Sequence, residues 1–197
     1  AYIAQSAAKS CKLKGAHRTH PLHVGAFCFF FGQKRSGNMQ KREEKKVSDS
    51  YTEQVQLLTK ANMNGYNRLF GGTLMEWIDV VAAIVARRHS GKNVTTVVVD
   101  TLQFKGPAYA NEHLLLTGKM TYVGRTSMEV CVKTFVEALD GKRRLINEAY
   151  VVMVALDENE RPTEVPGLIL ETDSEREAWQ HGERRNELRK KRRAEKY

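Results

Sequence analysis

The hydrophobic residues of this chain form one helix-like stretch, followed by several long extended stretches. Residues 74–89 (LMEWIDVVAAIVARRH) are apolar almost all round a helical wheel, and the turn Gly71-Gly72-Thr73 precedes them. Three basic residues end the stretch and Gly91 follows, as is typical of a helix C-terminus. The pattern predicts one long helix, and a helix that is apolar all round is normally buried.

Four stretches after this helix, and one before it, are rich in β-branched or alternating apolar residues. In chain order they cover residues 51–59, 94–104, 112–123, 126–139 and 144–156. Long strands joined by short turns after a single helix predict an α+β fold, in which the helix packs on an antiparallel sheet.

The charge of the chain is concentrated at its ends. Of a net +9 over 197 residues, residues 1–38 hold six basic and no acidic side chains, and residues 183–197 hold eight basic against three acidic ones. The remaining residues, 39–182, therefore have a net charge of −2. Basic ends on a mildly acidic body do not indicate a basic groove. Residues 184–196 also lack interleaved aromatic residues, so we do not expect nucleic-acid binding.

Composition and charge divide the chain into three parts. These are a leader or disordered basic segment over 1–46, a folded domain over 47–168 and a charged C-terminal helix over 169–197. The acid-free residues 1–38 resemble a transit peptide, but no small-residue cleavage site follows the apolar run Val24–Phe31. We expect Met39 to be the natural start, with leader or non-native sequence before it, and a loop over residues 41–49.

Membrane spans, disulfides and metal sites are not expected. No apolar run approaches the ~20 residues that a spanning helix needs. The three cysteines, Cys11, Cys28 and Cys131, make no disulfide framework, which favours a reducing compartment such as the cytoplasm. Cys11 and Cys28, with three nearby histidines, lack the paired spacing of a closed zinc site. Cys131 falls on a strand face and is expected to be a small core residue.

Asp79, in the middle of the apolar helical stretch, is the most informative residue. An unpaired carboxylate buried there costs free energy, so it would be paired, protonated or used in chemistry. Alternatively, Asp79 lies on a narrow exposed stripe with Glu76, three residues earlier on the same helix face. The pattern alone leaves both interpretations open.

Gly71 and Gly72 immediately precede this helix. The first N–H groups of a helix have no intrahelical partner and can hold an oxyanion, and glycine allows a ligand to approach closely. Taken alone, the glycines are more simply explained as a helix-entry turn. Together with a carboxylate about two turns later, they indicate water-mediated acyl transfer.

A series of motifs resembles the acyl-CoA thioesterases of the hotdog fold. In order they are Asn64, Phe70-Gly71-Gly72, Asp79 and the run GRTSMEV over 124–130. The chain is most similar to the bacterial hexameric acyl-CoA hydrolases and to the cytosolic long-chain acyl-CoA hydrolase of animals. The similarity covers about residues 51–166, and the basic C-terminal helix is similar to some bacterial members.

The resemblance implies an antiparallel sheet wrapped around one long central helix. Two such chains would form a continuous sheet, and three pairs a hexamer. It also implies hydrolysis of acyl-CoA to a free fatty acid and CoA, with no metal and no cofactor other than CoA as substrate and product. One departure is Asn67, since the family usually has glycine three residues after the asparagine. Asparagine can adopt the left-handed conformation that glycine would supply.

The resemblance also assigns roles to individual residues. Asp79 would act as general base on a water, or as nucleophile through an anhydride, and Asn64 of the opposite protomer would orient the water or the thioester. Backbone N–H groups near Gly71 and Gly72 would hold the oxyanion. Thr96 matches a polar position that lines the thioester site in the family.

Arg125, Thr126 and Ser127 resemble the turn that contacts CoA in this family. An arginine beside hydroxyl and backbone donors suits a phosphate or the pantetheine arm, although a plain hairpin turn with a solvated arginine explains the same residues. The alternative function is a non-catalytic acyl-CoA-binding hotdog regulator. Such regulators carry a helix-turn-helix before the hotdog, and residues 1–50 show no such helix pair.

Overall fold

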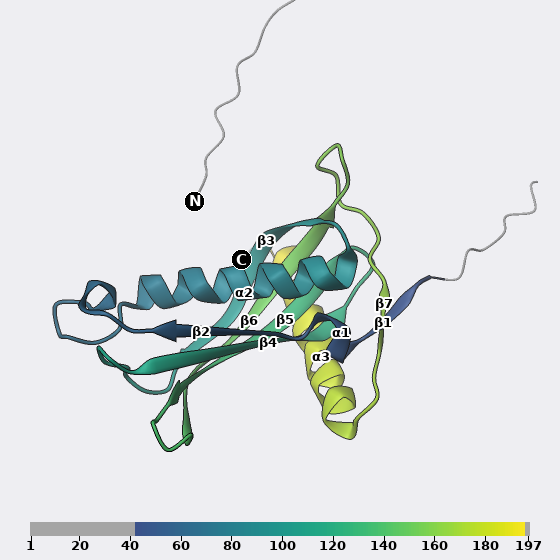
Figure 1. The fold of residues 1–197 in the computed structure, drawn as a ribbon. Coiled ribbons are helices and arrows are strands. Elements are labelled where there is room, and N and C mark those ends of the chain that lie inside the picture. Colours follow the sequence, from purple (N-terminus) through teal and green to yellow (C-terminus); the bar gives the residue numbers. More distant parts are fainter. Residues whose placement is uncertain (1–41, 196–197) are drawn as a thin grey trace, which may run out of the picture. The chain divides into compact units, whose positions relative to one another are not determined.

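The computed structural model describes residues 42–195. The elements in chain order are β1 (Glu44–Lys46), α1 (Val47–Ser50), β2 (Thr52–Leu57), a 3-10 turn (Lys60–Asn62), α2 (Gly71–Ser90), β3 (Asn93–Phe104), β4 (His113–Val123), β5 (Ser127–Glu137), β6 (Arg143–Leu156), β7 (Gly167–Ile169) and α3 (Asp173–Ala194). Five strands form one antiparallel sheet in the order β2-β4-β5-β6-β3, and β1 pairs in parallel with β7 (Figure 1). The predicted α+β fold, with one long helix on an antiparallel sheet, is confirmed.

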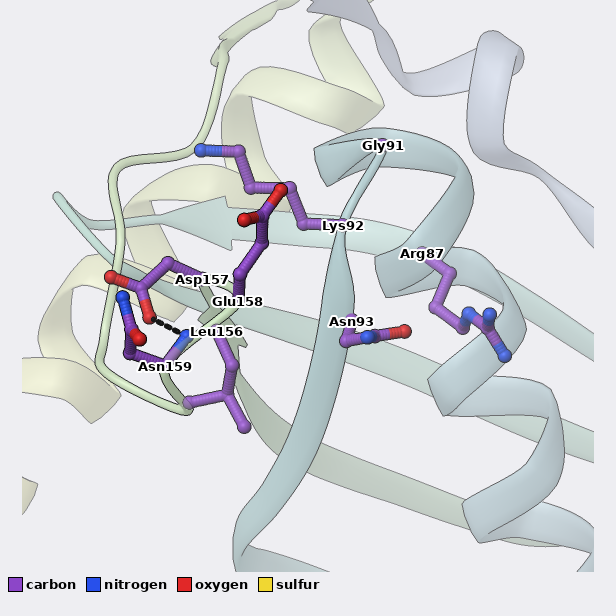
Figure 2. Close-up of a pocket in the computed structure, with 8 residues that line it drawn as sticks. All are labelled: Arg87, Gly91, Lys92, Asn93, Leu156, Asp157, Glu158 and Asn159. Atoms are coloured by element: carbon purple, nitrogen blue, oxygen red, sulfur yellow. Dashed lines mark hydrogen bonds between the residues drawn. The ribbon is translucent and has the colours of Figure 1, made fainter.

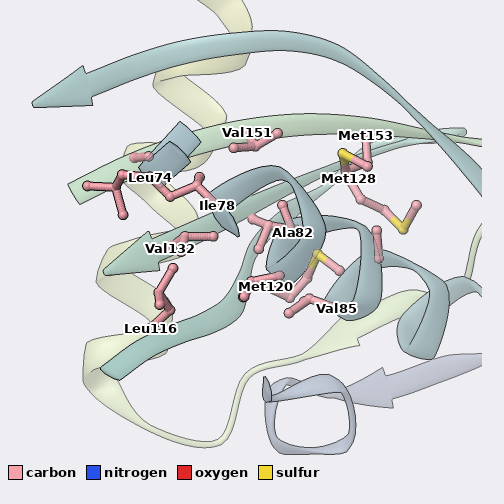
Figure 3. Packing of buried hydrophobic residues seen from close by; sticks show 14 of the residues in the cluster. Leu74, Ile78, Ala82, Val85, Leu116, Met120, Met128, Val132, Val151 and Met153 are labelled. Carbon is pink, nitrogen blue, oxygen red and sulfur yellow. The ribbon is translucent and has the colours of Figure 1, made fainter. Parts of the chain in front are cut away.

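The helix α2 contacts every strand of the five-stranded sheet, so the sheet wraps around it. Figure 3 shows Ile78 and Ala82 of α2 among side chains of the sheet that include Val132. Gly118 of β4 lies beneath the helix, because a Cβ atom there would be only 2.7 Å from Val81 Cγ1. A larger residue at this position would push α2 off the sheet.

The strand predicted over residues 126–139 is present as β5, and its predicted inner face is confirmed. The residues of the predicted face are all buried: Met128, Val130, Val132, Thr134 and Val136. Cys131 on the opposite face is also buried, as predicted, and burial raises the pKa of its thiol to about 11. The thiol therefore stays protonated at neutral pH, in keeping with a packing role.

One stripe of α2 is not covered by the sheet. Met75, Asp79 and Val80 are exposed along it, and the exposed Val99 on the edge strand β3 lines the same small pocket as Met75 and Asp79. We call these four residues the open face. The prediction that α2 is buried all round is wrong for the single chain, since the sheet leaves this stripe uncovered.

The loop predicted over residues 41–49 is also wrong. Lys45 of β1 pairs with Leu168 of β7, and Val47 in the short helix α1 is buried. Arg42 donates hydrogen bonds to the carbonyl oxygens of Gly124 at 2.6 Å and Val165 at 2.7 Å. The folded part therefore begins before residue 47. The leader predicted over 1–38 lies outside the described residues.

The C-terminal helix α3 packs on the face of the sheet opposite α2 (Figure 1). The ring of Trp179 lies 4.7 Å from that of Tyr122 on β4, and Gly182 is buried against the same strand. The helix and its Trp179 anchor were predicted, but Leu188, the second predicted anchor, is half exposed. Within residues 42–195, no helix is long and apolar enough to span a membrane.

Candidate active site

Asp79 lies two turns into α2, facing the start of β3. The Thr96 hydroxyl donates a hydrogen bond of 2.6 Å to Asp79 Oδ1 and lies 3.3 Å from the sulfur of Met153. The second carboxylate oxygen, Oδ2, has no hydrogen-bond partner among residues 42–195. Asp79 is exposed together with Glu76, so the exposed-stripe interpretation describes the single chain. One oxygen is thus fixed, and the other can accept a proton from a water.

Asn64 occupies the loop that leads into α2. Its Oδ1 accepts hydrogen bonds from the backbone N–H groups of Tyr66 at 2.9 Å and Arg68 at 3.2 Å. Because the loop holds the oxygen, the amide NH₂ group faces away and can donate to another group. Asn67 adopts a φ of +56°, so the left-handed conformation expected of this asparagine is confirmed.

The first turn of α2 presents unused backbone donors. Phe70 is the N-cap and its side chain makes no cap hydrogen bond. Within the described part of the chain, nothing accepts from the N–H groups of Gly71, Gly72 and Thr73. These groups lie at the positive end of the helix dipole and can stabilise an anionic oxygen. A Cβ atom on Gly72 would lie 2.6 Å from the ring of the exposed Phe70 and would displace that ring.

Arg125, Thr126 and Ser127 form the turn between β4 and β5. The carbonyl oxygens of all three accept backbone hydrogen bonds of 2.8 to 3.1 Å, so the turn is well held. The Arg125 guanidinium is largely exposed, and its closest carboxylate oxygen, on Glu164, lies 4.0 Å away. The arginine can therefore contact a phosphate without first breaking a strong ion pair.

An open pocket of about 800 Å³ lies where α2 ends and β3 begins (Figure 2). Its lining residues are Arg87, Gly91, Lys92, Asn93, Leu156, Asp157, Glu158 and Asn159. Lys92 Nζ lies 3.2 Å from the carbonyl oxygen of Glu164, the same residue that lies near Arg125. Sequence reasoning treated Arg87 only as a helix-end residue and did not single out Lys92. Nothing in the sequence indicated that Lys92 and Arg125 both lie near Glu164.

A second, much smaller pocket of about 20 Å³ borders Asp79. It is lined by Met75, Ile78, Asp79, Val99, Leu102 and Val151. Five of these six side chains are apolar, so Asp79 borders a hydrophobic pocket between α2 and the sheet. The volume is far below that of pockets that hold a ligand, so the pocket of the single chain does not accommodate an acyl chain.

A single chain does not bring all the predicted site residues together. Gly72 and Asp79 are seven residues apart on α2, an axial separation of about 10 Å at 1.5 Å per residue. Phe104, which packs on Gly71, and Thr96, which binds Asp79, lie eight residues apart on β3. A carboxylate and an oxyanion donor that act on one carbonyl lie closer than this. The structure thus separates Asp79 and Thr96 from the glycines and Asn64 of the same chain.

No group of three or more His, Cys, Asp or Glu side chains within residues 42–195 is placed to hold a metal ion. The cysteines and histidines considered for zinc, between Cys11 and Cys28, lie outside the described residues.

Sequence comparison relates the chain to known thioesterases. The profile of the thioesterase superfamily matches residues 66–139. An uncharacterized acyl-CoA thioester hydrolase of Bacillus subtilis is 40% identical over 113 residues, which are 57% of this chain and 66% of the relative. The cytosolic acyl coenzyme A thioester hydrolase of Homo sapiens is 29% identical over 146 residues, which are 73% of this chain and 38% of the relative.

Solved structures of acyl-CoA hydrolases are also similar to this chain, and the similarity covers nearly the full length of those structures. An acyl-CoA hydrolase of Staphylococcus aureus, solved with butyryl-CoA and CoA, superposes with a TM-score of 0.74 and is 34% identical, covering 78% of this chain and 94% of that chain. A hexameric acyl-CoA thioesterase superposes with a TM-score of 0.74 and is 36% identical, covering 77% of this chain and 98% of that chain.

Three variants of the Staphylococcus aureus enzyme have also been solved, each with alanine in place of an asparagine, an aspartate or a threonine. In that chain the aspartate follows the asparagine by 15 positions, and the threonine follows the aspartate by 17. Asn64, Asp79 and Thr96 have the same two spacings. With its profile match and solved relatives of which it covers over nine tenths, the chain belongs to the thioesterase superfamily, among the hotdog-fold acyl-CoA thioester hydrolases.

Proposed function

We propose that this protein hydrolyses acyl-CoA thioesters to a free fatty acid and CoA. The observation that carries the proposal is the Asp79 carboxylate, held at one oxygen by Thr96 and free at the other, beside a small apolar pocket. The names of the relatives support the same chemistry. So does the butyryl-CoA complex of the Staphylococcus aureus enzyme.

In the proposed mechanism, Asp79 Oδ2 takes a proton from a water that attacks the thioester carbonyl. The developing oxyanion is stabilised by the N–H groups of Gly71 and Gly72, and the free amide group of Asn64 orients the water or the carbonyl. CoA leaves as a thiolate. Since a thiol has a pKa of about 8.5, this leaving group needs no strong general acid.

The same geometry allows a second route, in which Asp79 attacks the carbonyl and forms an anhydride that water then hydrolyses. A single turnover in ¹⁸O-labelled water tests this route. Label on the Asp79 carboxylate would show an anhydride that water opens at the side chain, whereas a general base puts label only into the fatty acid.

The separation of Asp79 from Gly72 within one chain means that the site needs a second copy. β3 is an edge strand whose pairing within the described chain is with β6, and its exposed Val99 lies beside Met75 and Asp79 of α2. We propose that two copies join along β3 and bury the open face. Each Asp79 then meets the loop of Asn64 and the first turn of α2 from the partner. Three such pairs would give a hexamer, the assembly of the hexameric thioesterase relative.

For the CoA portion of the substrate we propose the turn of Arg125, Thr126 and Ser127. The exposed guanidinium of Arg125 can bind a phosphate. The pocket at the end of α2 (Figure 2) adds Arg87 and Lys92, but Asp157 and Glu158 line it as well. CoA takes part only as substrate and product. The few cysteines and the cytosolic human relative support the cytoplasm as the compartment.

The proposal is tested by measuring thiol release from a panel of acyl-CoA substrates. Asp79→Asn keeps the size of the side chain and should lower kcat by about 10³-fold, because it removes the base. The matched control is Glu76→Gln, an exposed carboxylate one helical turn away, which should keep the wild-type rate. A wild-type protein that binds acyl-CoA but releases no thiol would contradict hydrolysis and support the regulator instead.

A further inference from the structure

Three arginines of α3 reach across the outer face of the sheet to two buried carboxylates. Arg185 Nη2 lies 2.7 Å from Glu129 Oε1 on β5, and the guanidinium lies over the Tyr150 ring of β6, 3.8 Å from its centroid. These contacts tie the middle of α3 to the centre of the sheet.

The remaining two arginines connect this centre to the edge strand β3. Arg189 Nη1 lies 2.7 Å from Glu129 Oε2 and 2.8 Å from Asp100 Oδ2, so one nitrogen bridges two strands. Arg192 Nη2 lies 2.6 Å from the other oxygen of Asp100. We call Arg185, Arg189 and Arg192 the arginine row.

Both carboxylates of the arginine row and Arg189 are withdrawn from solvent, whereas Arg192 is exposed. The side chains of Glu129, Asp100 and Arg189 are only 0%, 5% and 9% exposed. Burial opposes ionisation of Asp100, but the hydrogen bonds and charges of Arg192 and Arg189 outweigh it and lower the pKa of Asp100. Such buried pairs seldom add more stability than apolar residues of the same size would, which points to a role other than stability.

The strand that carries Asp100 is irregular at this place. The pairing of β3 with β6 shifts between Thr96 and Val98, and again between Val99 and Thr101, so Val97 and Asp100 are left out of the register while Val98 and Val99 stay paired. β3 pairs on its other side with no strand of the described chain. Asp100 is therefore an irregular position of β3 whose side chain ties this segment to α3, and Thr96 lies at the start of the segment.

We propose that the arginine row positions the irregular segment of β3 and, through Thr96, sets the orientation of the Asp79 carboxylate. Arg189 is then a positioning residue that acts from the opposite face of the sheet. The inference rests on the proposed hydrolysis, because Asp79 is the base in that reaction.

The test compares Arg189→Met with Arg184→Met in the full-length protein. Arg184 is an exposed arginine of the same helix, outside the arginine row. Arg189→Met should lower kcat by about tenfold with little change in KM, since a misplaced base slows the chemical step more than it weakens binding. Arg184→Met should match the wild type. Arg189→Lys should restore most of the rate, because a single nitrogen makes both contacts.

Hydrogen exchange gives a readout that does not depend on activity. Amides of residues 94–101 should exchange faster in Arg189→Met, while those of β4 stay protected. If Arg189→Met does not fold, Arg192→Met removes only the exposed contact to Asp100 and should show the same changes more weakly. A folded Arg189→Met variant that has the wild-type kcat and unchanged amide exchange in residues 94–101 would overturn the inference. A wild-type protein without thioesterase activity, but with faster β3 exchange in Arg189→Met, would overturn only the proposed function.

Discussion

At the scale of single residues, the candidate site uses polar side chains that each have one polar group hydrogen-bonded within the chain and one left free. Thr96 occupies one oxygen of Asp79, and the loop backbone occupies the oxygen of Asn64. Each side chain is thereby oriented, and each keeps one polar group for the substrate. The pairing of Asp79 with Thr96, 17 positions apart, follows from the family resemblance and not from the periodicity of the helix or strand.

Thr96→Ala should lower kcat by roughly tenfold or more, because a hydrogen bond to a charged group contributes about 1.5–3 kcal/mol. Thr96→Ser keeps the hydroxyl and should retain most of the activity. Steady-state thioester hydrolysis by the three proteins provides the measurement. Equal rates for the alanine and serine variants would show that the hydroxyl does not act on Asp79.

Asn67 should be replaceable by glycine but not by alanine. Its φ of +56° costs a residue with a Cβ atom about 1 kcal/mol, unless a short polar side chain offsets the cost. Urea unfolding should therefore show Asn67→Ala less stable by about that amount and Asn67→Gly close to the wild type. Equal stability of the two variants would contradict the importance of the left-handed turn.

At the scale of elements, the long pieces were predictable and the short ones were not. Helix α2 and strands β3 to β6 each lie within a few residues of their predicted limits, because their periodicity is local. β1, α1 and β7 have three or four residues each, and β1 and β7 depend on each other across more than 120 positions. The alternation of β5 likewise could not show that Glu129 is buried against an arginine of α3.

The end of α2 contains a pH-sensitive contact. His89 is buried, with Nε2 3.0 Å from the carbonyl oxygen of Pro166 and no partner for Nδ1 among the described residues. Burial lowers the pKa of His89 below its ordinary value of 6.5. The unfolded chain therefore takes up a proton at a higher pH than the folded one, so stability falls as the pH drops below 6.5.

His89→Gln, which can still donate to the Pro166 carbonyl, should remove this part of the pH dependence. Urea unfolding at pH 7.5 and 5.5 should show a larger loss of stability in the wild type than in the variant. Losses of equal size would mean that His89 does not govern the change.

The Asp100 ion pairs affect stability in a different pH range. The lowered pKa of Asp100 means that their contribution is lost only as the pH falls below about 3.8.

At the scale of the whole molecule, the single chain contains the parts of a site but not the assembled site. Sequence periodicity predicted a buried α2, whereas the structure leaves Met75, Val80 and their neighbours on the open face uncovered. If a second copy covers that face, as we propose, the apolar pattern of α2 reflects two partners, the sheet of its own chain and the surface of the other. No property of one chain's sequence separates these contributions.

The most direct measurement combines two inactive variants, Asp79→Asn and Asn64→Ala, coexpressed in equal amounts. If each site takes Asp79 from one copy and Asn64 from the other, half of randomly formed pairs are mixed. Each mixed pair then contains one intact site, so about one quarter of the wild-type activity should return. If both residues act within one chain, every site lacks one of them, and the mixture should stay as inactive as either variant alone.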